Sequence, residues 1–220
     1  MSAPLLEVQG LTKSFADRVI LKDCSFELAA QERLSIQGPS GCGKSTLLRM
    51  LAGLEAADSG IIRLAGTTAT EGKRTLMSPW QRGIQMVFQD LGLWPTRSVL
   101  QHVVDVRKAA DLPDPAGVGK RILEDLGLGA QLKARPGTLS GGEARRLAFA
   151  RVMALEPRLL LLDEAFSSLD PDSRDQGFSV LEQVLAATGA GVILVTHDPS
   201  EAERLGGRAC RLLDGGLTCA

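Results

Sequence analysis

Strands and helices alternate along the chain when hydrophobic and polar positions are followed from its N-terminus. Two runs, 159–162 and 192–195, are apolar without alternation, which is typical of strands covered by helices on both faces of a sheet. Further strands are predicted at 5–8, 19–28, 33–37, 61–64 and 209–213. The pattern therefore predicts an α/β fold with a largely parallel sheet.

Helical segments are predicted between these strands. A helix over 44–54 follows a glycine-rich turn, and the stretch 90–151 leans toward helix, with a short amphipathic candidate at 121–128. Near the C-terminus, Asp198 can cap a helix that begins at Pro199. We interpret the stretch that leans toward helix as an inserted helical subdomain.

Polar residues follow both apolar runs directly. Asp163 and Glu164 come after the first run, and Thr196, His197 and Asp198 come at the end of the second. In an open parallel sheet, ligands bind beyond the carboxyl ends of the strands. We therefore expect the chemistry of the protein at these two strand ends.

A glycine-rich segment predicts phosphate binding. Residues 38–45 read Gly-Pro-Ser-Gly-Cys-Gly-Lys-Ser and fit GxxxxGK[ST] between a predicted strand and a predicted helix. Glycines let backbone N–H groups wrap a phosphate, Lys44 can reach the terminal phosphates, and the Ser45 hydroxyl can face Mg²⁺. A glycine-rich turn that merely caps a helix would not account for Lys44 and Ser45 in register. The predicted nucleotide-binding residues of this P-loop are Gly38, Pro39, Ser40, Gly41, Cys42, Gly43, Lys44, Ser45 and Thr46.

Two later motifs narrow the choice, because a P-loop alone also fits kinases, GTPases and helicases. The segment Leu-Ser-Gly-Gly-Glu at 139–143 stands shortly before the run RLLLLDEAFSSLD at 158–170. Here the sequence resembles the ABC ATPase family, with its signature loop in the first segment and its Walker B motif and D-loop in the second. Phe15, Gln89 and His197 match the family's adenine-stacking aromatic, Q-loop and switch histidine, in the family's order.

The resemblance implies an architecture. It is an α/β P-loop NTPase of ABC type, with a RecA-like core, an antiparallel β edge sheet and an inserted α-helical subdomain. We expect a single ABC ATPase domain over 1–220, with the core in 1–89 and 152–220 and the helical subdomain in 90–151. It also implies a homodimer in which two copies meet head to tail around two ATP molecules.

The resemblance assigns roles that suit phosphoryl transfer, where positioning and charge neutralisation dominate. Glu164 is expected to act as general base, and Lys44, Gln89 and His197 to act with it. The expected Mg²⁺ ligands are Ser45, Gln89 and Asp163; the residues expected to complete the nucleotide site are Phe15, Ser140, Gly141, Gly142 and Asp170.

Some of these residues also allow a simpler, non-catalytic interpretation. Asp163 and Glu164 could be solvated carboxylates, and Phe15 could be a core residue. His102 has no catalytic context and is predicted at the surface. The fifth signature residue is more often Gln in the family, so Glu143 is a departure, and a carboxylate there could weaken closure of the dimer.

The segments 78–89 and 91–95 resemble the ATPase subunits of bacterial importers. The resemblance implies a transmembrane permease and a solute-binding protein as partners, with the permease contact near Leu91, Trp94 and Val103. Trp94 is the expected aromatic anchor, although a buried core tryptophan would give the same pattern. No regulatory domain is expected after the ATPase core.

Composition excludes several classes of protein. With 25 Lys+Arg against 26 Asp+Glu, the chain has no basic surplus for nucleic acid. Its apolar runs fall short of the roughly 18 residues of a membrane-spanning helix, and its start has no leader pattern. We expect a cytoplasmic protein held on the inner face of the membrane by its permease. Four scattered cysteines and two histidines offer little to a zinc site.

Three other functions stay open from the sequence. An exporter or lipid-extraction ATPase would carry the same motifs, because the direction of transport depends mostly on the permease. An ABC-type ATPase of DNA repair or chromosome maintenance usually carries long coiled coils or zinc modules, which this chain lacks. The signature loop argues against a monomeric P-loop kinase.

Overall fold

A computed structural model describes residues 3–16, 18–167 and 169–219. The chain is a mixed α/β protein whose residues cluster in two compact units. The first unit is formed by Met1–Met86, Arg158–Glu164 and Gly189–Ala220, and the second by Val87–Pro157 and Ala165–Thr188.

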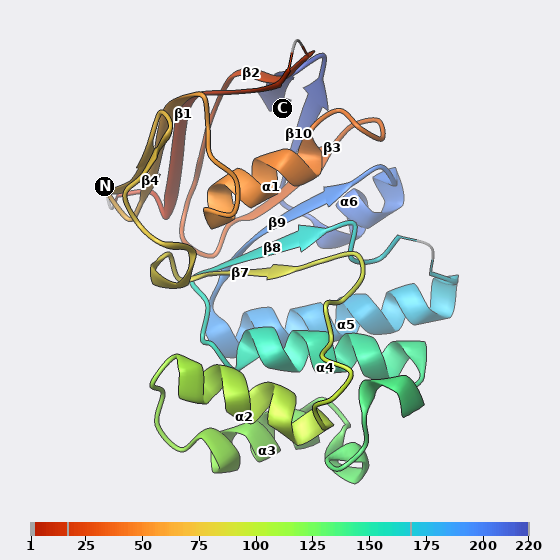
Figure 1. The fold of residues 1–220 in the computed structure, drawn as a ribbon. Helices are drawn as coiled ribbons and strands as arrows, with labels where there is room; N and C mark the ends of the chain where they lie inside the picture. The colour runs from red at the N-terminus through yellow and green to blue at the C-terminus, as the bar shows by residue number, and fades with distance from the viewer. Residues whose placement is uncertain (1–2, 17, 168, 220) are drawn as a thin grey trace. The chain divides into compact units, whose positions relative to one another are not determined.

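A six-stranded sheet organises the first unit (Figure 1). Its strand order is β11-β10-β3-β9-β8-β7, with β3 parallel to β10 and β9, and β8 parallel to β9. All residues of β8 and β9 are buried, so both predicted apolar runs are strands. The bounds are β3 Arg33–Gln37, β7 Ile84–Val87, β8 Leu159–Asp163, β9 Gly191–Thr196, β10 Arg208–Leu213 and β11 Gly216–Cys219.

Two helices pack against this sheet. The helix α1 (Lys44–Ala52) lies against β8, and α6 (Pro199–Leu205) lies against β3 and β9. The first ends two residues before the predicted end, because Gly53 takes the left-handed conformation of a C-cap. As predicted, Asp198 caps the second helix: its side chain accepts a hydrogen bond from Ser200 N.

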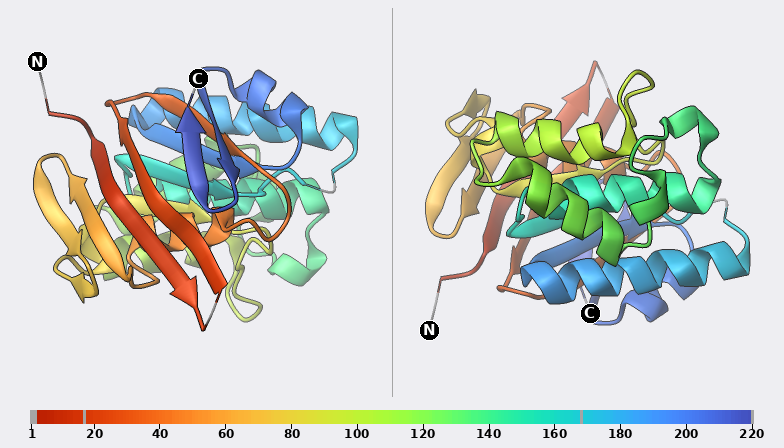
Figure 2. Two further views of the ribbon diagram at one scale, coloured as in Figure 1. Left: turned by 90° about the horizontal axis from the view of Figure 1, so that it is seen from above. Right: turned by 90° about the horizontal axis from the view of Figure 1, so that it is seen from below.

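The first unit also contains a five-stranded antiparallel sheet with the order β2-β1-β4-β5-β6. Figure 2 shows β1 and β2 as long neighbouring strands. The first strand is longer than the predicted 5–8, because register shifts after Val8 break the alternation of exposed and buried residues. The bounds are β1 Leu6–Phe15, β2 Arg18–Leu28, β4 Ser59–Leu64, β5 Thr67–Glu71 and β6 Arg74–Thr75, followed by a 3₁₀ turn, η1, at Pro79–Gln81.

Helices make up the second unit (Figure 2, right). The predicted helix at 121–128 is misplaced: α3 begins at Pro115, because the side chain of Asp114 caps its first turn by accepting a hydrogen bond from Gly117 N. Phe166 stacks on Phe178, with ring centroids 4.2 Å apart, in the core of this unit. The bounds are α2 Val99–Ala109, α3 Pro115–Asp125, α4 Gly141–Met153 and α5 Pro171–Thr188, with 3₁₀ turns η2 at Gly129–Gln131 and η3 at Pro136–Thr138.

A disulfide joins the last two strands of the first unit. Cys210 and Cys219 face each other across the antiparallel pair of β10 and β11 and are bonded. Sequence analysis did not predict this bond, because the bond depends on a hairpin whose second strand was not predicted.

Among the described residues, no helix combines the length and the apolar character that crossing a bilayer requires.

Candidate nucleotide site

Two glycines of the P-loop are required by close backbone approaches. A Cβ on Gly38 would stand 2.4 Å from the carbonyl oxygen of Leu212, and one on Gly43 would stand 2.7 Å from a side-chain carbon of Ile20. The φ of 107° at Gly43 is also unfavourable for residues with a side chain. The spacing of glycines that predicted a phosphate loop thus has a steric cause in this fold.

Lys44 is held beneath that loop. It is 4% exposed, and its Nζ donates hydrogen bonds to the carbonyl oxygens of Gly38 (2.8 Å) and Pro39 (3.0 Å). The same Nζ lies 3.5 Å from Oε1 of Glu164. A buried ammonium group is therefore fixed between the P-loop and the end of β8.

Asp163 is the last residue of β8 and is buried. Its Oδ1 accepts a hydrogen bond of 2.7 Å from the hydroxyl of Ser45. Burial raises the pKa of the Asp163 carboxyl above its usual value, and the Ser45 hydrogen bond opposes the shift. The interpretation of Asp163 as a solvated carboxylate is wrong. A hydroxyl and a carboxylate oxygen are the hard donors that Mg²⁺ prefers, so these residues fit that ion.

Glu164 follows in a left-handed backbone conformation, with φ of 48°. Such a conformation costs of order 1–3 kcal/mol and is concentrated at functional sites. The Glu164 N–H donates to the carbonyl oxygen of Val195 (3.1 Å). On the carboxylate, Oε2 lies 3.6 Å from Nδ1 of His197, whose side chain is 55% exposed. The backbone thus directs the carboxylate toward both Lys44 and His197.

A cavity of about 310 Å³ opens beside the P-loop, within the size range of small-molecule sites. It is lined by residues 18–20, 39–42 and 213–215. Phe15 pairs with Arg18 across the β1–β2 hairpin, so the aromatic ring belongs to the same hairpin end. The ring is 47% exposed, so the interpretation of Phe15 as a core residue is wrong.

The second unit carries the segment 139–143 that the sequence predicts as a signature loop. Ser140 is the N-cap of α4 and is exposed, and Gly141 and Gly142 form the first turn of that helix. The first N–H groups of a helix have no intrahelical partner and favour anions. Asp170 caps α5 in a similar way, since its Oδ1 accepts a hydrogen bond of 3.0 Å from Ser173 N. This hydrogen bonding lowers the pKa of Asp170.

Comparison with known proteins identifies the family of the chain. The model of the ABC transporter family matches residues 21–167 of the chain. The chain belongs to the ABC transporter family. It is 39% identical over 208 residues to the putrescine transport ATP-binding protein PotG of Escherichia coli, covering 93% of this chain. It is 39% identical over 211 residues to the aliphatic sulfonates import ATP-binding protein SsuB 2 of Agrobacterium fabrum, covering 96% of this chain.

A third relative is the Fe(3+) ions import ATP-binding protein FbpC of Mesorhizobium japonicum, 38% identical over 219 residues and 96% of this chain. The matched regions cover 54% of PotG, 76% of SsuB 2 and 58% of FbpC. The chain thus spans little more than half the length of two of these ABC family relatives.

The site residues predicted from the sequence are distributed over both units. Lys44, Ser45, Asp163, Glu164 and His197 come together in the first unit, at the carboxyl ends of β3, β8 and β9. Gln89, Ser140 and Asp170 belong to the second unit. Gln89 lies exposed in the turn after β7, and its predicted roles toward Mg²⁺ and the attacking water remain predictions.

Trp94 follows in an exposed loop. It is 40% exposed, so the alternative of a buried core tryptophan is wrong. Its indole stacks on the imidazole of His102, with centroids 5.3 Å apart, and the Arg151 guanidinium lies 5.4 Å from the indole. Arg151 also donates hydrogen bonds to the carbonyl oxygens of Leu91 (3.0 Å) and Gly92 (2.6 Å). These contacts present one aromatic side chain at the surface of the second unit.

Two expectations for this segment are wrong. His102 is not a surface residue: it is 0% exposed, because Trp94 and the first turn of α2 cover it. Val103 is also 0% exposed, because it packs inside the second unit, so its side chain cannot form part of a permease contact.

Lys13 is a residue that the sequence reasoning missed. Its Nζ lies 4.8 Å from the centroid of the Phe15 ring and 2.5 Å from Oε1 of Glu55, and it donates to the carbonyl oxygen of Ala56 (2.7 Å). The two-residue spacing from Phe15 on one strand was the available signal, because residues i and i+2 share a face. Lys13 therefore supports the aromatic ring.

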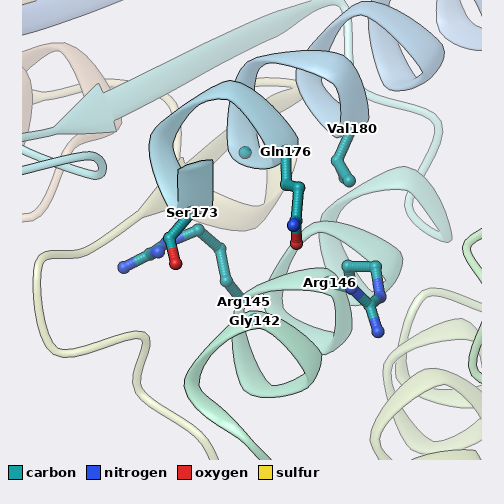
Figure 3. A pocket seen from close by; sticks show the side chains of 7 residues that line it. Gly142, Arg145, Arg146, Ser173, Gln176 and Val180 are labelled. Carbon is teal, nitrogen blue, oxygen red and sulfur yellow. The ribbon is translucent and has the colours of Figure 1, made fainter. Parts of the chain in front are cut away.

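A second cavity lies between α4 and α5, behind the signature loop (Figure 3). Gln176 of α5 points toward α4 there, and Gly142 and Arg146 lie on the α4 side. Its volume of about 10 Å³ holds at most one water molecule. This cavity is too small for a nucleotide group.

Proposed function

We propose that the chain binds and hydrolyses ATP and drives a separate membrane permease in solute import. The main support for this proposal is the position of the Glu164 carboxylate between Lys44 and His197, near the hydrogen-bonded pair of Ser45 and Asp163. A carboxylate next to a P-loop lysine and a candidate cation site is placed to accept the proton of an attacking water. Lys44 and His197 supply positive charge and hydrogen bonds to the terminal phosphate.

ATP is held by the P-loop and the cavity beside it in this proposal. The backbone N–H groups of residues 38–46 and Lys44 bind the phosphates, and the exposed ring of Phe15 stacks on adenine. Ser45, Asp163 and Gln89 would hold Mg²⁺. When bound, that ion neutralises phosphate charge. Lys44 and the backbone amides of the P-loop orient the phosphate chain even when Mg²⁺ is absent.

Dimerisation completes the site in this proposal. Ser140, Gly141, Gly142 and Asp170 serve the ATP bound to a second copy, so two copies enclose two ATP molecules. The exposure of Ser140 and its position at the start of α4, where the first backbone N–H groups have no carbonyl partner within the helix, support this role. We also propose that residues 90–151 form a helical subdomain inserted between core segments 1–89 and 152–220.

Import, rather than export, is supported by the relatives, whose names include putrescine transport, aliphatic sulfonates import and Fe(3+) ions import. The partners are a permease, contacted near Leu91 and Trp94, and a solute-binding protein. The chain then works in the cytoplasm, on the inner face of the membrane. The different solutes in these names leave the solute of this chain to be identified with its permease.

Substitution of Glu164 tests hydrolysis. Glu164→Gln should bind ATP, trap a dimer on size-exclusion chromatography and lower turnover by roughly 10²-fold to 10⁴-fold, since it removes the general base. Glu203→Gln, an exposed carboxylate of α6, is the matched control. Near-normal turnover of Glu164→Gln would remove this residue from the role of base.

Substitution of Ser140 tests the composite site. Ser140→Arg places a bulky side chain in the signature loop, so it should abolish hydrolysis while the monomer still binds ATP. Measured ATPase activity at the wild-type level would contradict the proposal that a second copy completes the site. Purification from membranes with the chain as bait, followed by ATPase assays with candidate solutes, identifies the permease and the solute.

A further inference from the structure

Glu143 is bonded on both of its carboxylate oxygens. Oε2 accepts hydrogen bonds from the backbone N–H of Ser140 (2.8 Å) and from the Ser140 hydroxyl (2.9 Å). Oε1 accepts a hydrogen bond of 2.9 Å from Nε2 of Gln131. The side chain is thereby fixed over the start of α4, in the signature loop itself.

These bonds use the Ser140 hydroxyl both as a donor and as an acceptor. Its single proton is donated to Glu143, and its oxygen accepts the N–H of Glu143 at 3.3 Å. A hydroxyl group has one proton to donate. The Ser140 hydroxyl therefore cannot donate to a phosphate oxygen until its bond to Glu143 is broken.

The carboxylate makes this restraint stronger than an amide would. Hydrogen bonds to an ionised acceptor are roughly twice as strong as neutral ones. The hydrogen bonds from Ser140 lower the pKa of Glu143, and the nearby Arg146 charge acts in the same direction, so the group stays ionised at neutral pH. A carboxylate in this place also repels the phosphate oxygens that a signature loop approaches.

Gln131 adds to the restraint from η2. Its Nε2 is directed at Glu143, while its Oε1 is buried without a hydrogen-bond partner among the described residues. Rotation of this amide by 180° would direct its oxygen at the carboxylate, and an amide oxygen cannot donate a hydrogen bond. The bond to Glu143 therefore fixes the orientation of the Gln131 amide.

We propose that Glu143 restrains the signature loop: it holds the Ser140 hydroxyl in the open protein, so that closure on a partner's ATP must exchange this bond for one to the terminal phosphate. Glu143 is a positioning residue, and it sets the ATP concentration at which two copies close. This inference rests on the proposed composite site. A glutamine at this position would accept the same bonds more weakly and carry no charge.

The experiment compares four proteins that share the Glu164→Gln substitution, so that hydrolysis does not consume the ATP. The first carries no further change, the second adds Glu143→Gln, the third adds Ser140→Ala, and the fourth adds both substitutions. For each protein, the ATP concentration that gives half-maximal dimer formation is measured by light scattering. Glu143→Gln should lower this concentration by roughly threefold to tenfold. In the proteins that carry Ser140→Ala, Glu143→Gln should change the logarithm of this ATP concentration by less than half as much, because no hydroxyl remains to be released.

Kinetics and stability provide a second readout. In the chain that retains Glu164, Glu143→Gln should lower the KM for ATP with little change in kcat, which a purely structural effect on α4 would not produce. Glu203→Gln is the matched carboxylate control. The melting temperature of Glu143→Gln should stay close to that of the wild type, because the amide keeps the cap of α4.

The outcomes separate this inference from the function on which it rests. If dimers form but Glu143→Gln leaves the ATP concentration unchanged, or shifts it equally with and without Ser140→Ala, the restraint by Glu143 is wrong. If the Glu164→Gln protein forms no ATP-dependent dimer, or Ser140→Arg retains hydrolysis, the composite site itself is wrong.

Discussion

The hydroxyl of Ser45 donates a hydrogen bond of 2.7 Å to Oδ1 of Asp163, which lies 118 residues further along the chain. The bond joins the first turn of α1 to the end of β8 and brings the end of the glycine-rich loop against the Asp163 carboxylate. Because Asp163 is buried, its ionised form is disfavoured in the folded chain without a cation.

Asp163→Asn should therefore stabilise the chain without Mg²⁺ and abolish Mg²⁺-dependent hydrolysis. The pKa of Asp163 is raised on folding, so its ionisation destabilises the fold progressively as the pH rises above the unfolded value of 3.8. We expect the variant to melt a few degrees higher than the wild type at pH 7 by differential scanning calorimetry. The difference should shrink toward pH 4.

Asp125→Asn is the matched control for this experiment, because Asp125 is an exposed carboxylate at the end of α3. It should leave the melting temperature unchanged. A lower melting temperature for Asp163→Asn than for the wild type at pH 7 would show that the ionised carboxylate stabilises the fold.

Acid should loosen the loop before α2 through His102. Its Nε2 accepts a hydrogen bond from Trp94 N (2.8 Å), and its Nδ1 lies 2.8 Å from the carbonyl oxygen of Ser98. This pattern requires a neutral imidazole with its proton on Nδ1. Burial lowers the pKa of His102, and the nearby charges of Arg151 and Arg97 oppose its protonation while Asp105 favours it.

The lowered pKa of His102 sets the direction in which stability changes with pH. Because the folded pKa lies below 6.5, the stabilising contribution is complete above pH 6.5 and is lost as the pH falls through the folded value. The wild type should lose more melting temperature between about pH 7.5 and 5 than His102→Gln does. Equal slopes for the two proteins would contradict this role.

Reduction of the Cys210–Cys219 disulfide should destabilise the first unit. The bond closes a short loop, with a sequence separation of 9, and loop-closure entropy predicts a loss of about 2–3 kcal/mol in the free energy of unfolding. Cys219→Ser without reductant should match the reduced wild type in urea unfolding. Cys42→Ser should respond to reductant as the wild type does, because Cys42 is a free thiol. Four titratable thiols in the unfolded, unreduced chain would show that the bond does not form.

Trp94→Ala should weaken binding to the permease. The indole is 40% exposed and is held by His102 and Arg151, so it offers a rigid apolar surface to a partner. We expect at least a tenfold loss of permease affinity in a pull-down titration, because an aromatic anchor contributes about 1.4 kcal/mol or more. Trp80→Ala, at an indole that is 82% exposed in η1, is the matched control. Equal binding by both variants would remove Trp94 from the interface.

Features that depend on neighbouring residues could be predicted from the sequence alone. The P-loop followed from glycines, Lys44 and Ser45 in fixed register, and β8 and β9 followed from unbroken apolar runs. The cap of α6 by Asp198 was readable in the same way. Such features are encoded within a few residues, because backbone conformation and hydrogen bonding at a cap or a loop are local.

Local patterns failed where a feature depended on distant partners. The alternation along β1 was broken by its register shifts, so most of that strand was missed. The burial of His102 was hidden, because the residues that cover it are placed by a loop and not by a periodic pattern. The Cys210–Cys219 bond depends on strand β11, which the composition of 216–219 did not predict.

The arrangement of the chemical groups in one site depends on the packing of the sheet. The sequence proposed Lys44, Glu164 and His197 separately, each with a family role, but their distances of 3.5 Å and 3.6 Å arise from the parallel order of β3, β9 and β8. Strand order depends on packing between segments that are distant in the sequence, such as Arg33 beside Val192, and no local pattern fixes it. The sequence therefore specified which groups are present, and the sheet determined that they share one site.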